Sequence, residues 1–172
     1  RLGDVVIVGL GTNGPITGYY EEETKALVEY LGDRKIYWIN NYAPGISWID
    51  ENNAYLEKLA KSLDVSNNIH FLGIRNREYV YSHLKDYDLL VQPSIYEGFG
   101  LTVAEGMIAG LPVLVSDVEG PMEIIQNGQY GYCFQVGNAE DMANKLVEML
   151  QNPIKVYEIA RIGQVYATSH FD

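Results

Sequence analysis

Cysteine and histidine are scarce in this chain. The 172 residues include one cysteine, Cys133, and three histidines, and no histidine is spaced to share a metal with a cysteine or an acid. A single cysteine excludes an internal disulfide, and its neighbours Tyr132 and Phe134 predict a buried, inert thiol. We therefore expect no metal site and a reducing, cytoplasmic setting.

Positive charge is also scarce. The chain has 12 basic and 23 acidic residues, which gives a net charge of −11 and argues against binding to duplex nucleic acid. Any phosphate group bound here is expected to be held by backbone amides or by a few placed side chains. No apolar run approaches the ~18 residues that a transmembrane helix needs.

The first residues do not predict a signal peptide. Its first residues, Arg1 to Asp4, run straight into an apolar segment, and no starting methionine is present. We expect a fragment or an excised domain.

Apolar segments with strand and helix patterns alternate along the chain. The predicted strands are continuously apolar rather than alternating, which is typical of strands buried on both faces. They cover residues 4–9, 35–40, 68–73, 87–92, 112–116 and 131–136. The predicted helices cover residues 20–31, 53–63, 76–85, 101–109, 121–126, 139–150 and 154–166, and a polar and aromatic loop is predicted at 41–51.

This alternation predicts an α/β fold with a doubly wound parallel sheet, in one Rossmann-like domain that spans residues 1–172. Ligands of such sheets bind beyond the carboxyl ends of the strands. The loops at that edge are 9–18, 40–52, 73–77, 93–101 and 117–120.

The segment Glu97-Gly-Phe-Gly100 directly precedes a predicted helix. Glycines let the backbone approach a ligand closely, and the start of a helix presents unpaired N–H groups and a positive dipole end. We expect the amides of Gly100, Leu101 and Thr102 to face a phosphate, with the Thr102 hydroxyl beside them. The alternative is that the glycines only permit a tight turn between strand and helix.

Two carboxylates flank this turn. Glu105 lies among apolar helix residues, where a carboxylate is costly unless it has a partner, and two vicinal ribose hydroxyls would satisfy both of its oxygens. Glu97, in the loop, could accept hydrogen bonds from sugar hydroxyls or stabilise positive charge at an anomeric carbon. The alternative for each is an ordinary solvent-exposed acid.

The run from Asp88 to Pro121, with the two carboxylates spaced as Glu97-x7-Glu105, resembles the signature of retaining family 4 glycosyltransferases of GT-B fold. Residues 123–128 and 131–136 continue the resemblance, which is strong over 68–150 and loose over 1–67. It covers the C-terminal, donor-binding half of such an enzyme, so the acceptor-binding N-terminal domain is absent from this chain.

The resemblance implies a role for each site residue. Glu105 would hold the ribose, and Glu97, the catalytic candidate, would contact the donor sugar. The backbone of five residues would bind the sugar and the β-phosphate: Gly98, Phe99, Gly100, Leu101 and Thr102. The base would lie beside Gly73, Ile74 and Arg75, and no metal or other cofactor would be required.

One departure from the family concerns the diphosphate. The family usually has an Arg and a Lys in the loop after the first strand, whereas residues 9–18 contain no basic residue. Backbone amides such as that of Gly11, with Thr12 or Thr17, are the first candidates to replace the pair. Arg75 and Arg77 are the second.

Three functions remain open at this stage. The first is the donor-binding domain of a glycosyltransferase that moves a sugar from a nucleoside-diphosphate sugar to a glycan or lipid-linked acceptor and is inactive as a fragment. The full-length enzyme is expected in the cytoplasm, with peripheral association with the inner membrane face left open. The second is a non-catalytic glycosyltransferase-like partner subunit with a degenerate phosphate site. The third is a flavodoxin-like binding or signalling domain, although the first loop lacks the acidic cluster of a phosphoacceptor domain.

Overall fold

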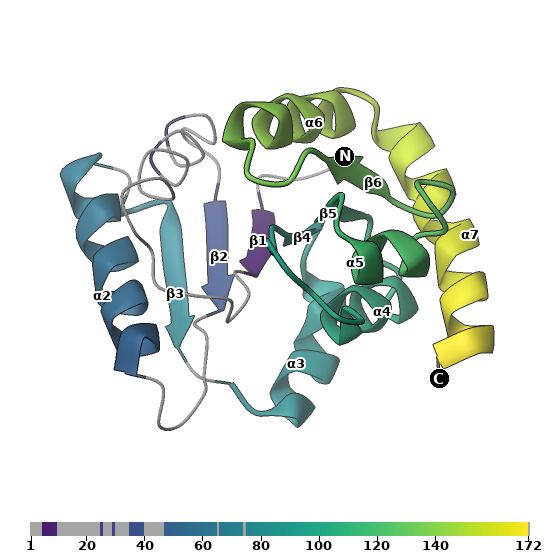
Figure 1. Cartoon of the computed structure of the whole chain (residues 1–172), viewed down its shortest axis with the longest axis horizontal. Helices are drawn as coiled ribbons and strands as arrows, with labels where there is room; N and C mark the ends of the chain where they lie inside the picture. Colours follow the sequence, from purple (N-terminus) through teal and green to yellow (C-terminus); the bar gives the residue numbers. More distant parts are fainter. Residues whose placement is uncertain are drawn as a thin grey trace.

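A computed structural model describes residues 5–9, 25, 29, 35–39, 47–64, 66–73 and 75–171 of the chain (Figure 1). The strands are β1 (Val5–Gly9), β2 (Lys35–Ile39), β3 (Ile69–Gly73), β4 (Leu90–Gln92), β5 (Val113–Ser116) and β6 (Tyr132–Phe134). The helices are α2 (Ser47–Ser62), α3 (Arg77–His83), α4 (Leu101–Ile108), α5 (Glu119–Ile124), α6 (Ala139–Gln151) and α7 (Pro153–Phe171), with a short 3₁₀ helix η1 (Leu84–Asp86) after α3.

The described strands form one parallel sheet in the order β3-β2-β1-β4-β5-β6. The chain adds strands outward from β1 to β3 and then crosses to β4 on the other side of β1. The order therefore reverses between β1 and β4, which is where doubly wound sheets bind ligands beyond their carboxyl ends. The predicted fold class is confirmed.

Side chains of the central strands pack into two separate hydrophobic layers, one on each face of the sheet. On β5, Leu114 faces the layer that contains Leu146 of α6, whereas Val113 and Val115 face the layer that contains Met107 of α4. All of these side chains are almost completely inaccessible to water. Burial on both faces explains why the strands are continuously apolar.

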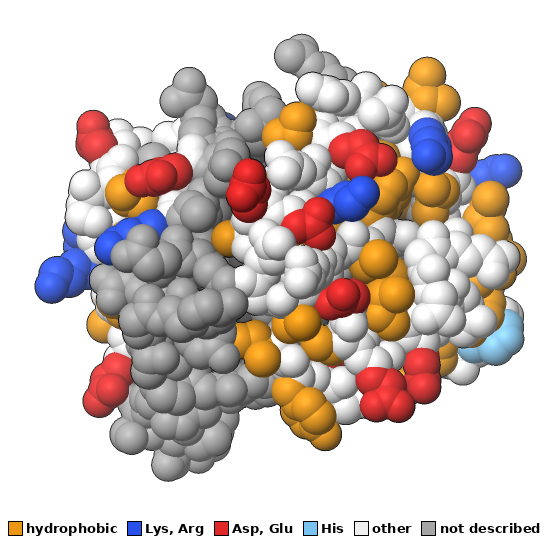
Figure 2. Space-filling view, turned by 45° about the horizontal axis from the view of Figure 1, so that its top comes forward, with side chains coloured by type: hydrophobic (Ala, Val, Ile, Leu, Met, Phe, Trp, Pro, Cys, Tyr) orange, Lys and Arg blue, Asp and Glu red, His pale blue; other side chains and the backbone are white. Residues whose placement is uncertain are grey.

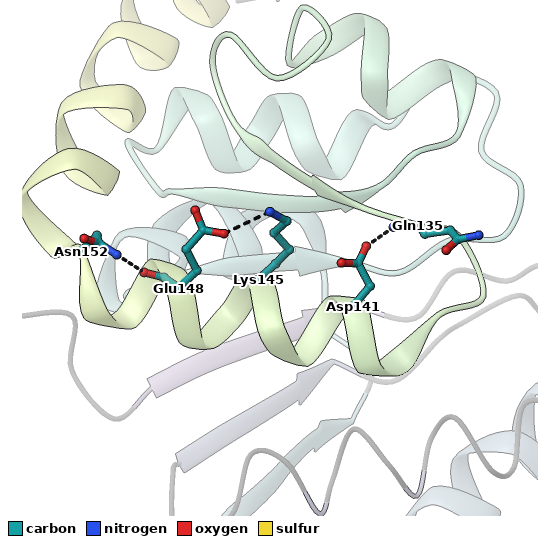
Figure 3. Close-up of polar contacts among 5 residues, drawn as sticks. All are labelled: Gln135, Asp141, Lys145, Glu148 and Asn152. Atoms are coloured by element: carbon teal, nitrogen blue, oxygen red, sulfur yellow. Dashed lines mark hydrogen bonds and ion pairs between the residues drawn. The ribbon is translucent and has the colours of Figure 1, made fainter.

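Polar contacts tie α6 to the strand before it (Figure 3). Asn138 caps the helix by accepting a hydrogen bond from the amide of Asp141, and the Asp141 carboxylate accepts one from the amide of Gln135 at 2.7 Å. The Lys145–Glu148 pair, at 3.0 Å, is exposed and contributes little to stability. The capping residues thus define where α6 begins, as the sequence predicts.

The largest differences from the predicted element boundaries are in two helices, α2 and α7. The predicted loop at 41–51 is wrong over its last residues, because α2 begins at Ser47 rather than at Asn53. Asn52 is buried at a position where the apolar pattern of the helix expects a hydrophobic residue, so the pattern stops there. At the other end of the chain, α7 continues to Phe171, five residues beyond the predicted end.

The predicted helix at 20–31 lies largely outside the described residues; Lys25 and Glu29 are helical. Among the described helices, none is both long and apolar enough to cross a membrane.

Tyr87, which precedes β4, makes stability depend on alkaline pH. Burial raises the pKa of its hydroxyl from 10.0 to about 12, and the charge and hydrogen bond of Tyr79 add to the increase. A raised pKa means that the folded state favours the neutral phenol. This stabilisation is complete below pH 10 and is lost as the pH rises towards 12.

We expect Tyr87→Phe to flatten the fall in the free energy of unfolding between about pH 10 and 12. Urea unfolding of both proteins at several pH values measures this, and the wild-type chain is the reference because its other tyrosines are shared. Equal slopes for the two proteins would contradict the assignment.

Candidate functional site

The loop at residues 93–100 joins β4 to α4 at the carboxyl edge of the sheet, beside the point where the strand order reverses. Buried side chains hold its beginning. Gln92 donates a hydrogen bond to the Ser94 hydroxyl at 2.8 Å, and the Ser116 hydroxyl at the end of β5 donates to the Ser94 carbonyl. Because all three side chains are buried, these bonds tie the loop to two strands in a site of low dielectric.

The end of the loop forms an uncapped helix N-terminus. Gly100 precedes α4 with a φ of 93°, a left-handed conformation that favours glycine, and it has no side chain that could cap the helix. Its carbonyl accepts from the amides of Val103 and Ala104. The amides of Leu101 and Thr102 have no acceptor within the helix, and no acidic residue lies in this first turn. Such a terminus is suited to an anionic ligand.

The first turn of α5 contacts the backbone of the loop. A Cβ atom added to Gly120, in the first turn of α5, would lie 2.6 Å from the carbonyl oxygen of Glu97 and 2.8 Å from backbone atoms of both Gly98 and Phe99. The backbone of the loop therefore rests directly on Gly120. The first turn of α5 therefore prevents the backbone of the loop from moving closer to α5.

Glu105, in the second turn of α4, has partners on α3. The Tyr81 hydroxyl donates a hydrogen bond to its Oε1 atom at 2.9 Å, and the Arg77 guanidinium approaches the same oxygen at 3.7 Å. The Glu105 side chain is 19% exposed. The carboxylate is thus half-buried and held from one side, as a charged group among apolar neighbours requires.

The other residues of the loop and of the first turn of α4 form a mostly exposed surface. Glu97 and Thr102 are half-buried, whereas Phe99 and Leu101 are 46% and 63% exposed. The Phe99 ring packs edge-on against Phe171 at the end of α7, with 5.8 Å between ring centroids. An apolar ligand surface can therefore reach the first turn of α4, where the amides of Leu101 and Thr102 have no acceptor within the helix.

The residues predicted beside a base follow β3. Gly73 ends the strand with a φ of 67°, a left-handed conformation that favours glycine. The guanidinium carbon of Arg75 lies over the Tyr79 ring, 4.9 Å from its centroid. Three predicted site residues lie outside the described residues: Gly11, Thr12 and Ile74.

Charged side chains do not form a continuous basic area on the described part of the face in Figure 2, where acidic, basic and apolar groups are interspersed. This agrees with the net charge of −11. In the part of the chain that the structure describes, no group of three or more His, Cys, Asp or Glu residues could hold a metal ion.

The model of one family, glycosyl transferases group 1, matches residues 45–164, which is more than half of the chain. The chain belongs to the glycosyl transferases group 1 family. The match includes the whole segment from β3 to α6 and therefore the loop, the start of α4 and Glu105.

Relatives and solved structures agree with this family. A sucrose synthase from Thermosynechococcus vestitus is 35% identical over 132 residues, which is 69% of this chain and 16% of that protein. The fold is similar to Anabaena HepE in complex with UDP and glucose, with a TM-score of 0.79 at 21% identity over 99% of this chain and 45% of that chain. It is also similar to the C-terminal domain of a group 1 glycosyl transferase from Francisella tularensis, with a TM-score of 0.77 at 24% identity over 97% of this chain and 86% of that one.

These comparisons confirm the predicted fold and the prediction of a C-terminal domain of a GT-B glycosyltransferase. The chain spans under a quarter of the length of the curated relative and under half of HepE. Within this group 1 domain, sequence reasoning missed Tyr81 and Gly120. Gly120 could have been noticed as a further glycine at the carboxyl edge of the sheet, whereas nothing in the sequence marks Tyr81.

Proposed function

We propose that this chain is the donor-binding domain of a retaining glycosyltransferase that transfers a sugar from a nucleoside-diphosphate sugar to a glycan or lipid-linked acceptor. One observation carries the proposal. A glycine-rich loop leads into an uncapped helix N-terminus, and a half-buried carboxylate, Glu105, is held one turn further along the same helix. That spacing suits a ligand with a phosphate beside hydroxyl groups.

The diphosphate is proposed to lie at the start of α4. The first amides of the helix and its positive dipole end would stabilise the phosphate charge, which increases on the leaving group during transfer. This replaces a cluster of basic side chains, consistent with the acidic composition of the chain. The exposed backbone of Gly98 allows the sugar to approach closely.

The two carboxylates are proposed to divide the remaining contacts. Glu105 would accept from the ribose hydroxyls, and Glu97 would contact the hydroxyls of the donor sugar. The base would lie near Gly73 and Arg75. Complexes of Anabaena HepE with UDP and with UDP-glucose, which share this fold, support a uridine nucleotide as the first candidate.

Residues 1–172 are proposed to form one nucleotide-sugar-binding domain, and the acceptor would be bound by another domain of a longer protein. Retention of configuration and independence from metal are part of the proposal. Reaction on one face of the sugar would then rely on the leaving phosphate and on the positioned amides.

Calorimetric titration of the chain tests the proposal. UDP and GDP, and UDP-glucose and GDP-mannose, would each be titrated without added metal and in the presence of EDTA. We expect saturable binding of one base, with the sugar conjugate bound at least as tightly as the diphosphate. Binding of none of the four ligands at millimolar concentration would contradict the donor-binding proposal.

The second candidate, a non-catalytic partner subunit with a degenerate phosphate site, is favoured by the absence of basic residues from residues 9–18. It predicts the negative result of the same titration.

We expect Glu97→Ala to separate the sugar from the nucleotide. The substitution should leave UDP affinity unchanged and weaken UDP-glucose by about 1.5–3 kcal/mol, the scale of hydrogen bonds to a charged acceptor. Glu123→Ala, which removes an exposed acid from α5, is the matched control and should change neither affinity. Equal losses for UDP and UDP-glucose would contradict the proposed role of Glu97.

A further inference from the structure

Two residues on α3 form a short chain of hydrogen bonds that ends on Glu105. Arg77 and Tyr81 lie one helical turn apart, so their side chains extend along the same face. The Arg77 Nε donates to the Tyr81 hydroxyl, and that hydroxyl donates to the Oε1 atom of Glu105. The Arg77 guanidinium also lies over the Tyr81 ring, 4.9 Å from its centroid.

The order of donors in this chain is determined by chemistry. A guanidinium has only donors, so the tyrosine oxygen must accept from Arg77. A tyrosine hydroxyl has one proton, which is then committed to Glu105. Each bond polarises the next, so Arg77 strengthens the Tyr81–Glu105 bond without hydrogen-bonding to the carboxylate itself.

A direct ion pair does not explain the arrangement. Arg77 is 74% exposed and 3.7 Å from the carboxylate, and exposed pairs of this kind contribute little. The short contact to Glu105 is the neutral tyrosine hydroxyl at 2.9 Å.

We propose that Tyr81 is a positioning residue that holds Glu105 in the orientation that accepts the ribose hydroxyls, and that Arg77 directs the Tyr81 proton to it; this inference rests on the proposed function. Both α3 residues contact Oε1, so the proposal assigns Oε2 to the ribose. Without these contacts, the Glu105 side chain would lose rotamer entropy when the nucleotide binds. With them, the side chain is already ordered and that cost is smaller.

The test compares ligands with and without ribose hydroxyls. We expect Tyr81→Phe to weaken UDP binding about fivefold, since it removes one hydrogen bond that orients a charged acceptor. The affinity for 2′,3′-dideoxy-UDP should not change, because that ligand has no hydroxyls for Glu105. Tyr81 is 45% exposed, so the substitution should spare the fold, which thermal unfolding would verify.

Three further variants complete the design. Tyr81→Phe should have no additional effect in a Glu105→Ala background, and Arg77→Met should have no additional effect in a Tyr81→Phe background, as a double-mutant cycle would measure. Tyr157→Phe is the matched control. Its hydroxyl also contacts a carboxylate, that of Asp88 at 3.4 Å, but at the amino end of β4.

Failure of the positioning role and failure of the proposed function give different results. If Glu105→Ala leaves UDP affinity unchanged, Glu105 does not bind the ribose and the donor-site assignment itself is wrong. If Glu105→Ala weakens UDP binding but Tyr81→Phe does not, or if the two effects add, only the positioning role is overturned. A uniform loss for UDP and its dideoxy analogue with Tyr81→Phe would likewise overturn it.

Discussion

Replacing Glu105 with alanine is expected to weaken UDP binding by about 1.5–3 kcal/mol, or roughly 10- to 150-fold. The variant removes a half-buried carboxylate that is already held by the Tyr81 hydroxyl. Ribose hydroxyls that leave water for the site would then lack an acceptor, and an unsatisfied hydroxyl costs more than the bond itself contributes. Isothermal titration of UDP measures the change directly.

Two comparisons make this result specific. Glu105→Gln keeps an acceptor oxygen of the same shape and should lose less affinity than Glu105→Ala. Glu148→Ala removes another helical glutamate with a basic partner, Lys145, on α6, and should leave UDP affinity unchanged. A folded Glu105→Ala protein with wild-type affinity would show that the ribose lies elsewhere.

The sheet could be predicted from the sequence because both faces of its strands are buried. That burial produces continuous apolar runs such as residues 113–115, which Gly110 and Pro112 separate from the preceding helix α4. The turn before α4 was also predictable, since Gly100 adopts a φ that favours glycine. These features depend on the local chain alone.

Features that depend on tertiary packing could not be predicted. Tyr81 and Glu105 are 24 residues apart, and only the tertiary fold brings these residues of α3 and α4 together. The start of α2 was missed for a related reason. Asn52 is buried there, and a buried polar residue interrupts the apolar pattern from which the helix was predicted.

The contact of Gly120 with the loop also depends on tertiary packing. It leads to a second prediction, a large loss of ligand affinity on substitution. Gly120→Ala is expected to reduce UDP-glucose affinity at least tenfold, about 1.4 kcal/mol. The new Cβ would lie 2.6 Å from the carbonyl oxygen of Glu97 and 2.8 Å from the backbone of Phe99. Backbone cannot rotate away as a side chain can, so either the loop or α5 must shift.

A shift of the loop would move Gly100 and the first amides of α4 away from the proposed phosphate position. We also expect a stability cost of about 1–3 kcal/mol, the usual cost of inserting a methyl group into a well-packed site. Urea unfolding measures the stability, and titration of UDP-glucose into the folded variant measures the affinity.

Gly163→Ala provides the matched control for this prediction. The added Cβ would lie 2.8 Å from the carbonyl oxygen of Tyr130, a comparable clash with backbone, but between α7 and the segment before β6. It should reduce stability as Gly120→Ala does and leave UDP-glucose affinity intact. If Gly120→Ala binds UDP-glucose as tightly as the wild-type chain, the position of the 97–100 loop does not determine donor binding. If both variants lose affinity together, the loss reports general destabilisation and not the contact between Gly120 and the loop.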